Sequence, residues 1–398
     1  RRLERETQRN VELMWLMNRL APDFKTIADF RKDNGKAIKA VCRQFIMLCQ
    51  RLNLFADSLV AIDGSRFKAV NNRDRNYTKA KVKRRIEAIN KSLDRYLGQL
   101  ESYDRQDQKV PDAKIQHINK QMASLKRQMQ EVQAIEAALE DTPDKQVSLT
   151  DPDARAMATN ARSSGSVGYN VQTAVDSQHH LIVAHEVTTA MGDRRQLTRM
   201  SKQAREATGV HDLEVIADRG YFNMDEIKST VDAGITPYVP KSLTSGNRSK
   251  GLYDRRDFLY IEQDDEYQCP AGERLSRRTT TQDGNKVMWR YWSSNCGKCH
   301  LKSKCTTGKE RRVSRWEHGN VLEAHERRMQ QSPTMMQLRK QTVEHPFATI
   351  KSWMGMDHFK TRTLKRVSTE MSLHVLAYNL TRMINILGVK PLIRSIEA

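Results

Sequence analysis

The sequence has no run of 18 consecutive apolar residues, the length at which a membrane-spanning helix becomes a candidate. Its charged beginning, RRLERETQRN, contains no hydrophobic stretch of the signal-peptide kind. Aromatic residues make up only 6% of the chain, yet 38% of its 398 residues are hydrophobic, which is enough for a sizeable core. We therefore expect a folded cytoplasmic protein of two or three domains with no membrane partner. Because the chain begins with Arg1, we also expect its natural amino terminus to lie upstream.

Acidic residues are too few to balance the basic ones. Lysine and arginine total 68 and aspartate and glutamate 48, which gives a formal net charge of +20. This excess favours a polyanionic partner, with nucleic acid first and an acidic membrane surface second. A basic but inert surface is the alternative.

Cysteine is scarce and unevenly placed. Of six cysteines, Cys42 and Cys49 lie in an apolar helical pattern typical of core residues, and the other four follow the spacing C-x26-C-x2-C-x5-C. Four thiolates in two tight turns suit a tetrahedral, structural Zn²⁺. The predicted ligands are Cys269, Cys296, Cys299 and Cys305. Reduced free cysteines and a redox C-x-x-C are the alternatives, and His300 could replace one sulfur.

The periodicity of the apolar residues predicts an alternation of strands and helices. Helical spacing occurs at 9–22 and 36–55, and a short apolar run at 59–63 is typical of a buried strand. The patterns that follow predict, in order, a strand pair at 167–190, helix 193–208, strand 213–217, helix 223–233 and strand 235–240. Two more helices are predicted at 335–354, with Pro346 near the first turn or at a bend, and at 368–387.

From about 78 to 140, leucine, isoleucine and methionine keep helical spacing on charged segments broken at Pro111. This pattern predicts a helical hairpin of coiled-coil character inserted after the first strand. Such an apolar stripe usually serves packing, and we expect the hairpin to be a candidate dimer contact.

Two strand-like runs lead into an aspartate: LVAI precedes Asp63, and LEVIA precedes Asp218. Catalytic groups of open sheets gather at strand ends, and a buried carboxylate is costly unless it is paired or binds a metal. Glu344, at the head of a predicted helix, is the candidate third acid. Carboxylates around two Mg²⁺ ions suit phosphodiester chemistry, because one ion activates the attacking oxygen and the other stabilises the leaving one. Taken singly, a strand-end aspartate is more often a cap and a helix glutamate a surface charge.

Five motifs occur in a fixed order: Asp63-Gly64-Ser65, DPDARAM, GYNVQTAVD, ADRGYF and VEHPFATIK. In this order they resemble the DDE transposases of bacterial insertion sequences, of the insertion-sequence-1182 type, over nearly the whole chain. The resemblance implies a ribonuclease-H-like core and a catalytic triad of Asp63, Asp218 and Glu344 that binds two Mg²⁺ or Mn²⁺ ions. It also implies that residues before Arg1 contribute to recognition of the terminal repeats.

Related families share the signature Y-x2-R-x3-E-x6-K around the last acid. Glu344 and Lys351 fit it, but Gln337 and Lys340 occupy the tyrosine and arginine positions. Arg339, one residue away, is the candidate to replace the arginine. The residues expected to contact DNA are Lys351, Lys340, Arg339 and Arg219. The basic run KCHLKSKCTTGKERRVSR is expected to touch DNA phosphates, with a merely solvated loop as the alternative.

The expected architecture is an α/β, ribonuclease-H-like core, a mixed sheet flanked by helices, with a helical coiled-coil-like insertion and a cysteine-rich, zinc-ribbon-like insertion. Its expected parts are a helical segment at 1–55, a core of 56–76, 146–241 and 330–398, a hairpin at 77–145 and a basic cysteine-rich insertion at 242–329. The expected partners are double-stranded DNA, as element terminal inverted repeats and target, and a second copy of the chain on paired ends. No small-molecule substrate is expected, and the location would be the bacterial cytoplasm, at the nucleoid.

The expected activity is metal-dependent strand cleavage at insertion-sequence ends followed by strand transfer into target DNA. Water and then a freed 3′-hydroxyl would be the nucleophiles, which fits the lack of a convincing Ser/His/Asp or Cys/His arrangement in the sequence. Two alternatives are a metal-dependent nuclease that does not join strands and a catalytically silent, transposase-derived DNA-binding protein.

Overall fold

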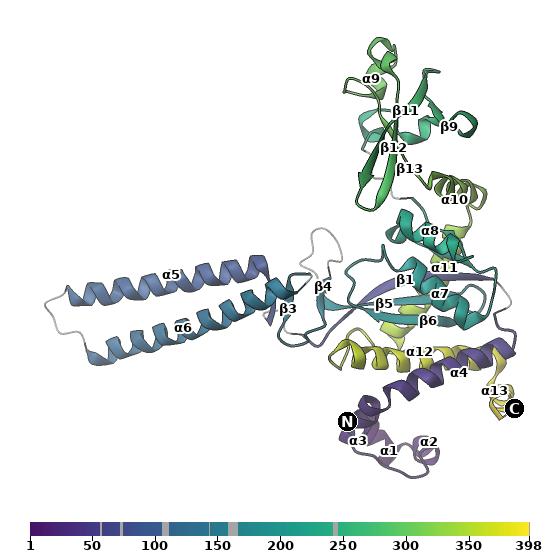
Figure 1. Ribbon diagram of the computed structural model, residues 1–398. Coiled ribbons are helices and arrows are strands. Elements are labelled where there is room, and N and C mark those ends of the chain that lie inside the picture. Colours follow the sequence, from purple (N-terminus) through teal and green to yellow (C-terminus); the bar gives the residue numbers. More distant parts are fainter. Residues whose placement is uncertain are drawn as a thin grey trace. The chain divides into compact units, whose positions relative to one another are not determined.

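The computed structural model describes residues 1–55, 58–71, 75–105, 111–142, 144–157, 166–241 and 246–397, except for the side chain of residue 104. Within these residues the chain is a mixed α/β protein, as predicted, and no helix is long and apolar enough to cross a membrane (Figure 1). It divides into two compact units. One comprises Arg1–Ala56, Asp63–Gly192 and Val343–Ala398, and the other Asp57–Ile62 and Asp193–Thr342.

The largest sheet of the described residues is mixed, with strand order β4-β5-β1-β7-β8 and β6 also paired to β5. Its strands are β1 (Leu59–Lys68), β4 (Arg155–Met157), β5 (Ser166–Asp176), β6 (Ile182–Thr188), β7 (Glu214–Ala217) and β8 (Thr236–Tyr238). β5 runs antiparallel to β4 and β6, whereas β7 is parallel to both β1 and β8. With α7 (Leu197–Thr208) and α8 (Met224–Asp232), the elements follow the predicted order β-β-β-α-β-α-β, except that β4 is an additional strand between the first and the second. The short edge strand β4 carries too few residues for a periodic signal and was not predicted.

β1 is longer than the apolar run that predicted it. It continues to Lys68, so the prediction that the strand ends at Asp63 was wrong. The ladder between β1 and β7 nevertheless stops at the pair Ile62 and Ala217. Beyond this point Phe67 is fully buried, and its carbonyl lies so close to Gly168 of β5 that a Cβ there would sit 2.1 Å from the oxygen. Gly168 therefore permits the close backbone approach.

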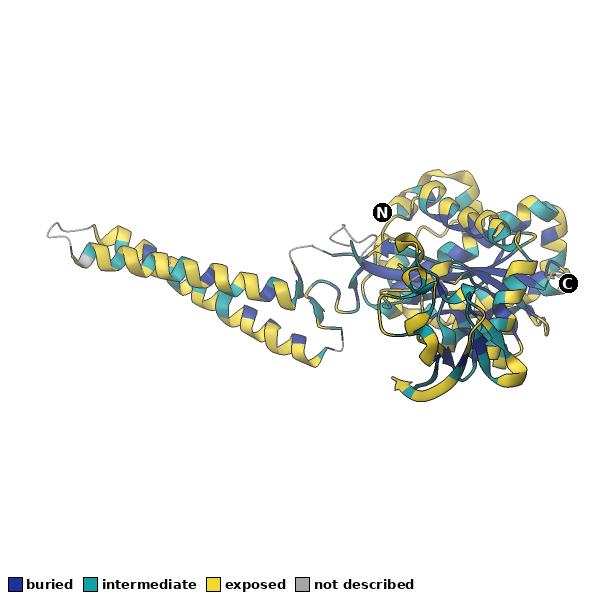
Figure 2. Cartoon of the chain, turned by 90° about the horizontal axis from the view of Figure 1, so that it is seen from above, coloured by how far each residue is buried: buried dark blue, intermediate teal, exposed yellow. Residues whose placement is uncertain are grey.

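α12 (Leu364–Leu387) forms much of the core of the first unit. Val367, Met371, Val375 and Tyr378 recur at helical spacing and are buried. Figure 2 shows long strands largely in the buried colour, whereas the helices are largely exposed. α12 contacts both β6 and α4 (Gly35–Arg51). The Asn379 side chain accepts from the Ile182 amide and donates to the Ile182 carbonyl, both at 2.9 Å. It thus makes the two hydrogen bonds that a neighbouring strand would otherwise make with Ile182.

The two early cysteines lie on the face of α4 toward α12, which agrees with the prediction of core residues for Cys49 and partly for Cys42. Cys49 is fully buried, whereas Cys42 is half-buried and its thiol donates to the Ser372 carbonyl at 3.4 Å. Burial raises the pKa of Cys42 to about 11 and that of Cys49 to about 12. Both thiols are therefore neutral and unreactive at physiological pH.

The prediction of one helix at 9–22 was wrong. α1 (Arg2–Arg9) ends at Asn10, whose side chain then caps α2 (Val11–Leu16) by accepting from the Leu13 amide at 3.0 Å. A further helix, α3 (Phe24–Asp33), follows with Asp23 as its cap and was missed. At the other end of the chain α13 (Val389–Glu397) was also missed.

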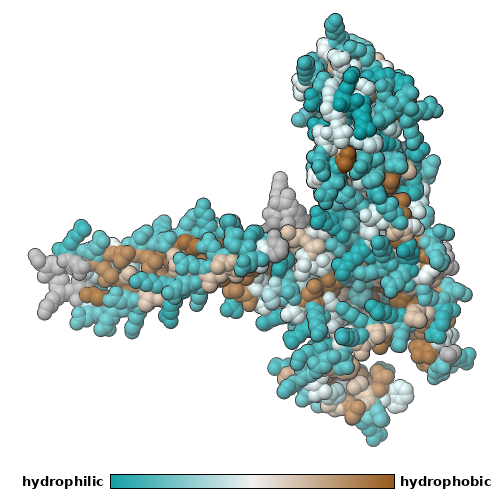
Figure 3. Space-filling view, in the orientation of Figure 1, coloured by the Kyte–Doolittle hydropathy of each residue, from teal (hydrophilic) through white to brown (hydrophobic). Residues whose placement is uncertain are grey.

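α5 (Lys79–Asp104) and α6 (Asp112–Asp141) run side by side in the stretch where a helical hairpin was expected. Their buried contact residues are Val82, Ile89, Val132, Ile135 and Leu139. Figure 3 shows apolar side chains following the seam between the helices. The short strands β2 (Asn76–Thr78) and β3 (Gln146–Ser148) pair antiparallel and bring the two ends of the insertion together.

The second unit contains an antiparallel sheet of order β13-β12-β11-β10-β9. Its strands are β9 (Leu259–Ile261), β10 (Glu266–Gln268), β11 (Arg274–Asp283), β12 (Lys286–Trp292) and β13 (Val313–Trp316). Tyr267 and Tyr291 are buried in it at a ring distance of 5.1 Å. No strand was predicted here, because most outward positions are polar and the apolar alternation is short.

α10 (Gly319–Gln331) and α11 (Met335–Ala348) follow this sheet. Pro346 was predicted near the first turn of its helix or at a bend, and it lies in the last turn of α11. The π-helical segment Thr349–Trp353 follows α11 directly. A proline lacks the amide hydrogen that an α-helix requires, and the wider π turn is a common response to an interrupted ladder.

Candidate active site

The two predicted catalytic aspartates follow the last paired residues of β1 and β7. Asp63 comes after Ile62, Asp218 comes after Ala217, and Ile62 and Ala217 are partners in the parallel ladder. Asp63 is half-buried, whereas the Asp218 side chain is 47% exposed. Asp63 thus lies within β1 where that strand separates from β7, and Asp218 lies at the carboxyl end of β7, the kind of position where open α/β sheets carry functional groups.

Local hydrogen bonding holds the backbone around Asp218. Its Oδ1 accepts from the Gly220 amide at 2.8 Å and caps the 3-10 helix Arg219–Tyr221. A Cβ on Gly220 would lie 2.9 Å from that oxygen, so a larger residue at this position would have to displace the Asp218 carboxylate. Arg219 is exposed at the start of this turn.

Arg339 of α11 is the charged neighbour of Asp218. Its guanidinium Nη2 lies 4.0 Å from Asp218 Oδ2, and its side chain is 16% exposed. The arginine expected to replace the missing member of the family signature is thus beside one of the predicted acids. Lys340, which occupies the signature position itself, is exposed on the next residue of the helix.

Glu344 is also exposed on α11, one turn after Lys340 and on the same helix face. Within the described parts of the chain, no three His, Cys, Asp or Glu side chains are arranged to hold a metal ion. This finding applies to the three acids and to the cysteine cluster alike. The sequence-predicted triad is therefore not assembled into a ligand set in this structure.

Lys351 is the predicted DNA-contacting residue with the richest environment. It lies in the π-helical segment, where its Nζ donates to Ser65 Oγ at 2.6 Å and to the Arg66 carbonyl at 3.1 Å. The ammonium also lies 4.6 Å from the Phe67 ring centroid. Burial lowers the pKa of Lys351, and the Asp63 carboxylate opposes that shift. Lys351 is therefore a half-buried cation beside Asp63.

The DPDARAM motif has a structural role that its sequence did not reveal. Asp151 is fully buried, and its two oxygens lie 2.9 and 2.8 Å from the Tyr169 hydroxyl. It also accepts from the amide of Thr363, whose backbone has an unusual φ of +73° at the start of α12. Asp153 accepts from the next amide, Leu364, at 2.7 Å. These aspartates cap α12 and hold it to β5, so they are not free for catalysis.

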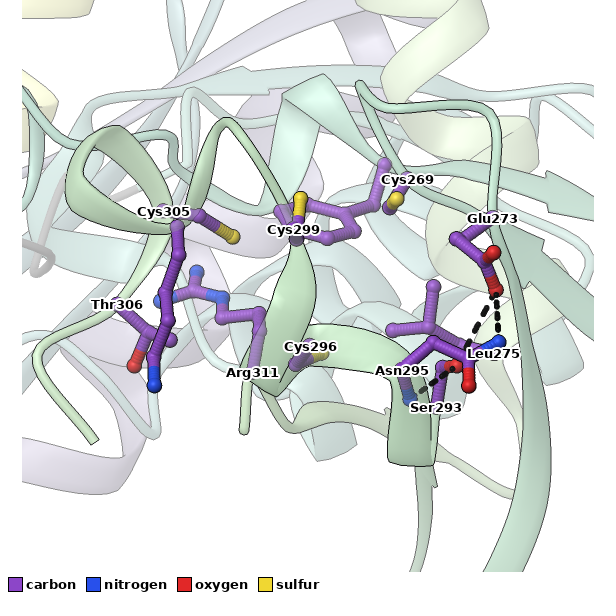
Figure 4. Close-up of a pocket in the computed structure, with 12 residues that line it drawn as sticks. Cys269, Glu273, Leu275, Ser293, Asn295, Cys296, Cys299, Cys305, Thr306 and Arg311 are labelled. Carbon is purple, nitrogen blue, oxygen red and sulfur yellow. Dashed lines mark hydrogen bonds between the residues drawn. The ribbon is translucent and has the colours of Figure 1, made fainter. Parts of the chain in front are cut away.

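The four clustered cysteines line one pocket of the second unit, together with Arg311 and Lys302 (Figure 4). Burial raises the pKa of Cys305, the Arg311 cation opposes this shift, and the other three thiols reinforce it. His300, the alternative ligand, is exposed and does not line this pocket.

Two tryptophans of this unit are covered by arginines. The Arg277 guanidinium lies 4.2 Å from the Trp289 ring, and that of Arg312 lies 4.9 Å from the Trp292 ring. Exposed lysines flank the cysteine cluster: Lys298, Lys304 and Lys309. The unit therefore presents a strongly basic surface.

Residues 268–384 match the family model described as "Transposase DDE domain", which supports a DDE transposase. The match includes Arg339, Glu344 and Lys351 and the cysteine cluster, but it begins after Asp63 and Asp218. No curated protein matches the chain.

Among solved structures, the chain is similar to one described as "Cryo-EM structure of piggyBac transposase synaptic complex with hairpin DNA". The identity is 8% and the TM-score 0.27, over 93% of this chain and 57% of that chain. The chain thus spans less than two thirds of that protein, and a likeness this weak carries no argument about fold or mechanism.

Proposed function

We propose that the protein is a DDE transposase with a ribonuclease-H-like core, which cleaves DNA at the ends of an insertion sequence and joins the freed ends to target DNA. The observation that carries the proposal is the register of the parallel ladder. Because Ile62 pairs with Ala217, Asp63 and Asp218 are the next residues beyond the paired stretch of two adjacent parallel strands, Asp63 within β1 and Asp218 directly after β7. The family match at 268–384 supports the same class independently.

Asp63, Asp218 and Glu344 would hold two Mg²⁺ or Mn²⁺ ions. Their carboxylate oxygens are the hard donors that these ions prefer, and a divalent ion would compensate the charge of half-buried Asp63. When bound, the ions supply activation of the attacking oxygen and stabilisation of the leaving oxygen. The Asp218 oxygen that does not cap the 3-10 helix lies 4.0 Å from the Arg339 Nη2.

Basic side chains would position the DNA around these acids. Lys351 keeps its ammonium next to Asp63 through Ser65, and Lys340 and Arg219 are exposed for phosphate contacts. Water would attack the phosphodiester and leave a 3′-hydroxyl, and this hydroxyl would then attack a target phosphodiester. Protein side chains form no covalent bond with DNA in this scheme.

Plasmid cleavage tests the proposal. The chain is incubated with Mg²⁺ or Mn²⁺ and a supercoiled plasmid that carries candidate element ends, and nicked and joined products are resolved on gels. Asp63→Asn, Asp218→Asn and Glu344→Gln should each lower product formation by at least about a hundredfold, because metal-ion stabilisation contributes several kcal/mol. Asp232→Asn and Glu136→Gln are matched controls, since both acids are exposed on helices outside the proposed site.

The products also separate the alternatives. Nicking without joining would support a nuclease, and DNA binding without any product would support a silent DNA-binding protein. Triad variants with parental activity would refute the assignment of the acids.

We also propose that the α5/α6 hairpin contributes to a dimer on paired DNA ends. Because β2 and β3 pair directly, residues 79–145 can be replaced by a short turn without separating the two strands. Size-exclusion chromatography with light scattering should show a monomer for this deletion and a dimer for the parent. A folded deletion variant in the same oligomeric state as the parent would overturn this part of the proposal.

A further inference from the structure

Four thiols reach one pocket from separate points of the chain. Cys269 follows β10, Cys296 and Cys299 lie in and after the 3-10 helix Ser294–Lys298, and Cys305 ends α9 (Lys302–Cys305). All of them line the same pocket, and Figure 4 shows the four side chains around it with Arg311 among them. A cluster of this kind requires the fold of the whole second sheet and not just the C-x2-C pair.

Tight turns hold the cysteines on both sides of the pocket. At the first, the Cys269 amide donates to the Glu273 carbonyl at 2.9 Å and the Gly272 amide donates to the Cys269 carbonyl at 2.8 Å. Gly272 has a φ of +84°, which glycine adopts without strain. At the second turn, the Cys299 amide donates to the Cys296 carbonyl at 3.4 Å, and the Lys302 amide donates to the Cys299 carbonyl at 3.1 Å. Both turns present their sulfurs from a constrained backbone, as structural metal sites require.

The charges around the pocket favour an anionic occupant. Arg311 and Lys302 both line it. The Arg311 Nε is buried and makes no hydrogen bond among the described residues, and a buried donor without a partner is costly. Four thiolates around a divalent cation carry a net charge of about −2, which the two cations would balance and to which the Arg311 Nε could donate.

We propose that Cys269, Cys296, Cys299 and Cys305 bind one structural Zn²⁺, with Arg311 as the residue that compensates its charge. Zinc favours a closed tetrahedral set of four sulfurs, and such a site braces surrounding strands instead of performing catalysis. The sulfurs are not at ligand spacing in this structure, so zinc would draw them together by rotation of the side chains within the pocket. The inference does not depend on the proposed DNA chemistry.

Metal analysis of the full chain tests the site. Protein produced in zinc-supplemented medium and desalted with a reductant should contain about one zinc per chain by mass spectrometry. Cys299→Ser should lose the metal, whereas Cys42→Ser should keep it because Cys42 lies in the other unit. Zinc content equal to that of the parent in Cys299→Ser, iron in place of zinc, or no bound metal in the parent would each overturn the proposal.

A cobalt experiment avoids dependence on a variant that fails to fold. Parent protein stripped of metal and titrated with Co²⁺ should develop thiolate-to-cobalt charge-transfer absorption that saturates at about one equivalent, and Zn²⁺ should displace it. Absence of these bands would contradict thiolate ligation.

The role of Arg311 has its own measurement. Arg311→Gln should still bind zinc. Titration with a competing chelator should show that the zinc affinity of this variant is about 10- to 100-fold weaker than that of the parent, the usual effect of losing a residue that hydrogen-bonds to a metal ligand. Lys309→Gln is the matched control, since Lys309 is exposed and does not line the pocket. Equal zinc affinity in the two variants would remove Arg311 from the site.

Discussion

The Lys351 ammonium donates a 2.6 Å hydrogen bond to Ser65 Oγ, two residues beyond Asp63 on β1. A second donation goes to the Arg66 carbonyl at 3.1 Å. One lysine from the π-helical segment thus ties the carboxyl-terminal half of β1 to the helix that carries Glu344. These contacts explain why a half-buried cation is tolerated here, because two oxygens accept hydrogen bonds from the ammonium and the Phe67 ring makes a cation–π contact with it.

Lys351→Met should weaken both folding and DNA processing. Methionine keeps an apolar stem against Phe67 but removes the donors to Ser65 and Arg66, which should lower the free energy of unfolding by about 1–3 kcal/mol. Urea unfolding measures the loss, and plasmid nicking under folding conditions measures activity. Lys365→Met, at an exposed position of α12, should change neither. A Lys351→Met protein with parental stability would show that the two hydrogen bonds contribute nothing to folding.

Asp151→Asn should destabilise the protein without affecting chemistry in the molecules that remain folded. The change replaces one of the two carboxylate oxygens by an amide nitrogen that can only donate, so either the Tyr169 hydroxyl or the Thr363 amide loses its acceptor. We expect the free energy of unfolding to fall by about 1–3 kcal/mol. Thermal unfolding checks the first statement. Product yield per folded molecule checks the second, and a selective loss of activity at full stability would indicate a catalytic role for Asp151.

His325 should make the protein less stable in mild acid. It is 1% exposed, its Nε2 accepts from the Val239 amide at 3.3 Å, and burial lowers its pKa to about 4. Between that value and the ordinary pKa of about 6.5 the unfolded state binds more protons. The free energy of unfolding therefore falls as the pH falls through this window, by up to about 1.4 kcal/mol per pH unit.

His325→Gln supplies the test, because glutamine retains an acceptor but does not titrate. The slope of unfolding free energy against pH between about 6.5 and 4 should be shallower in this variant than in the parent. His300→Gln, at an exposed position, should keep the parental slope. Parallel curves for the parent and His325→Gln would contradict the pKa assignment.

Neutralising Lys298, Lys304 and Lys309 to glutamine should weaken DNA binding in a salt-dependent way. Each phosphate contact contributes about 0.9 to the slope of log affinity against log salt, so the slope should fall by up to about 2.7. Fluorescence anisotropy at several salt concentrations measures it. The triple variant of Lys91, Lys114 and Lys120 removes the same charge from the α5/α6 hairpin and should have a smaller effect. Equal slopes would indicate a general charge effect and no phosphate contacts at the cysteine-rich unit.

Local pattern was sufficient for the regular elements with a strong apolar period. β5, β6 and α12 were predicted because their buried positions alternate, run together or recur every three to four residues. Local pattern failed for β9 to β13, where outward polar residues outnumber the buried tyrosines. It also failed for α1 to α3, where Asn10 ends α1 and caps α2, and Asp23 caps α3.

The sequence by itself determined the mixed α/β class, the order of the strands and helices with a strong apolar period, the positive charge and the spacing of acids and cysteines, because all of these depend on composition and local periodicity. Tertiary structure alone decided that Ile62 pairs with Ala217, that Lys351 reaches Ser65, and that Asp151 is a buried cap and not a catalytic acid. These relations join residues up to 286 positions apart along the chain. They depend on strand register and on burial, which only the packed chain defines.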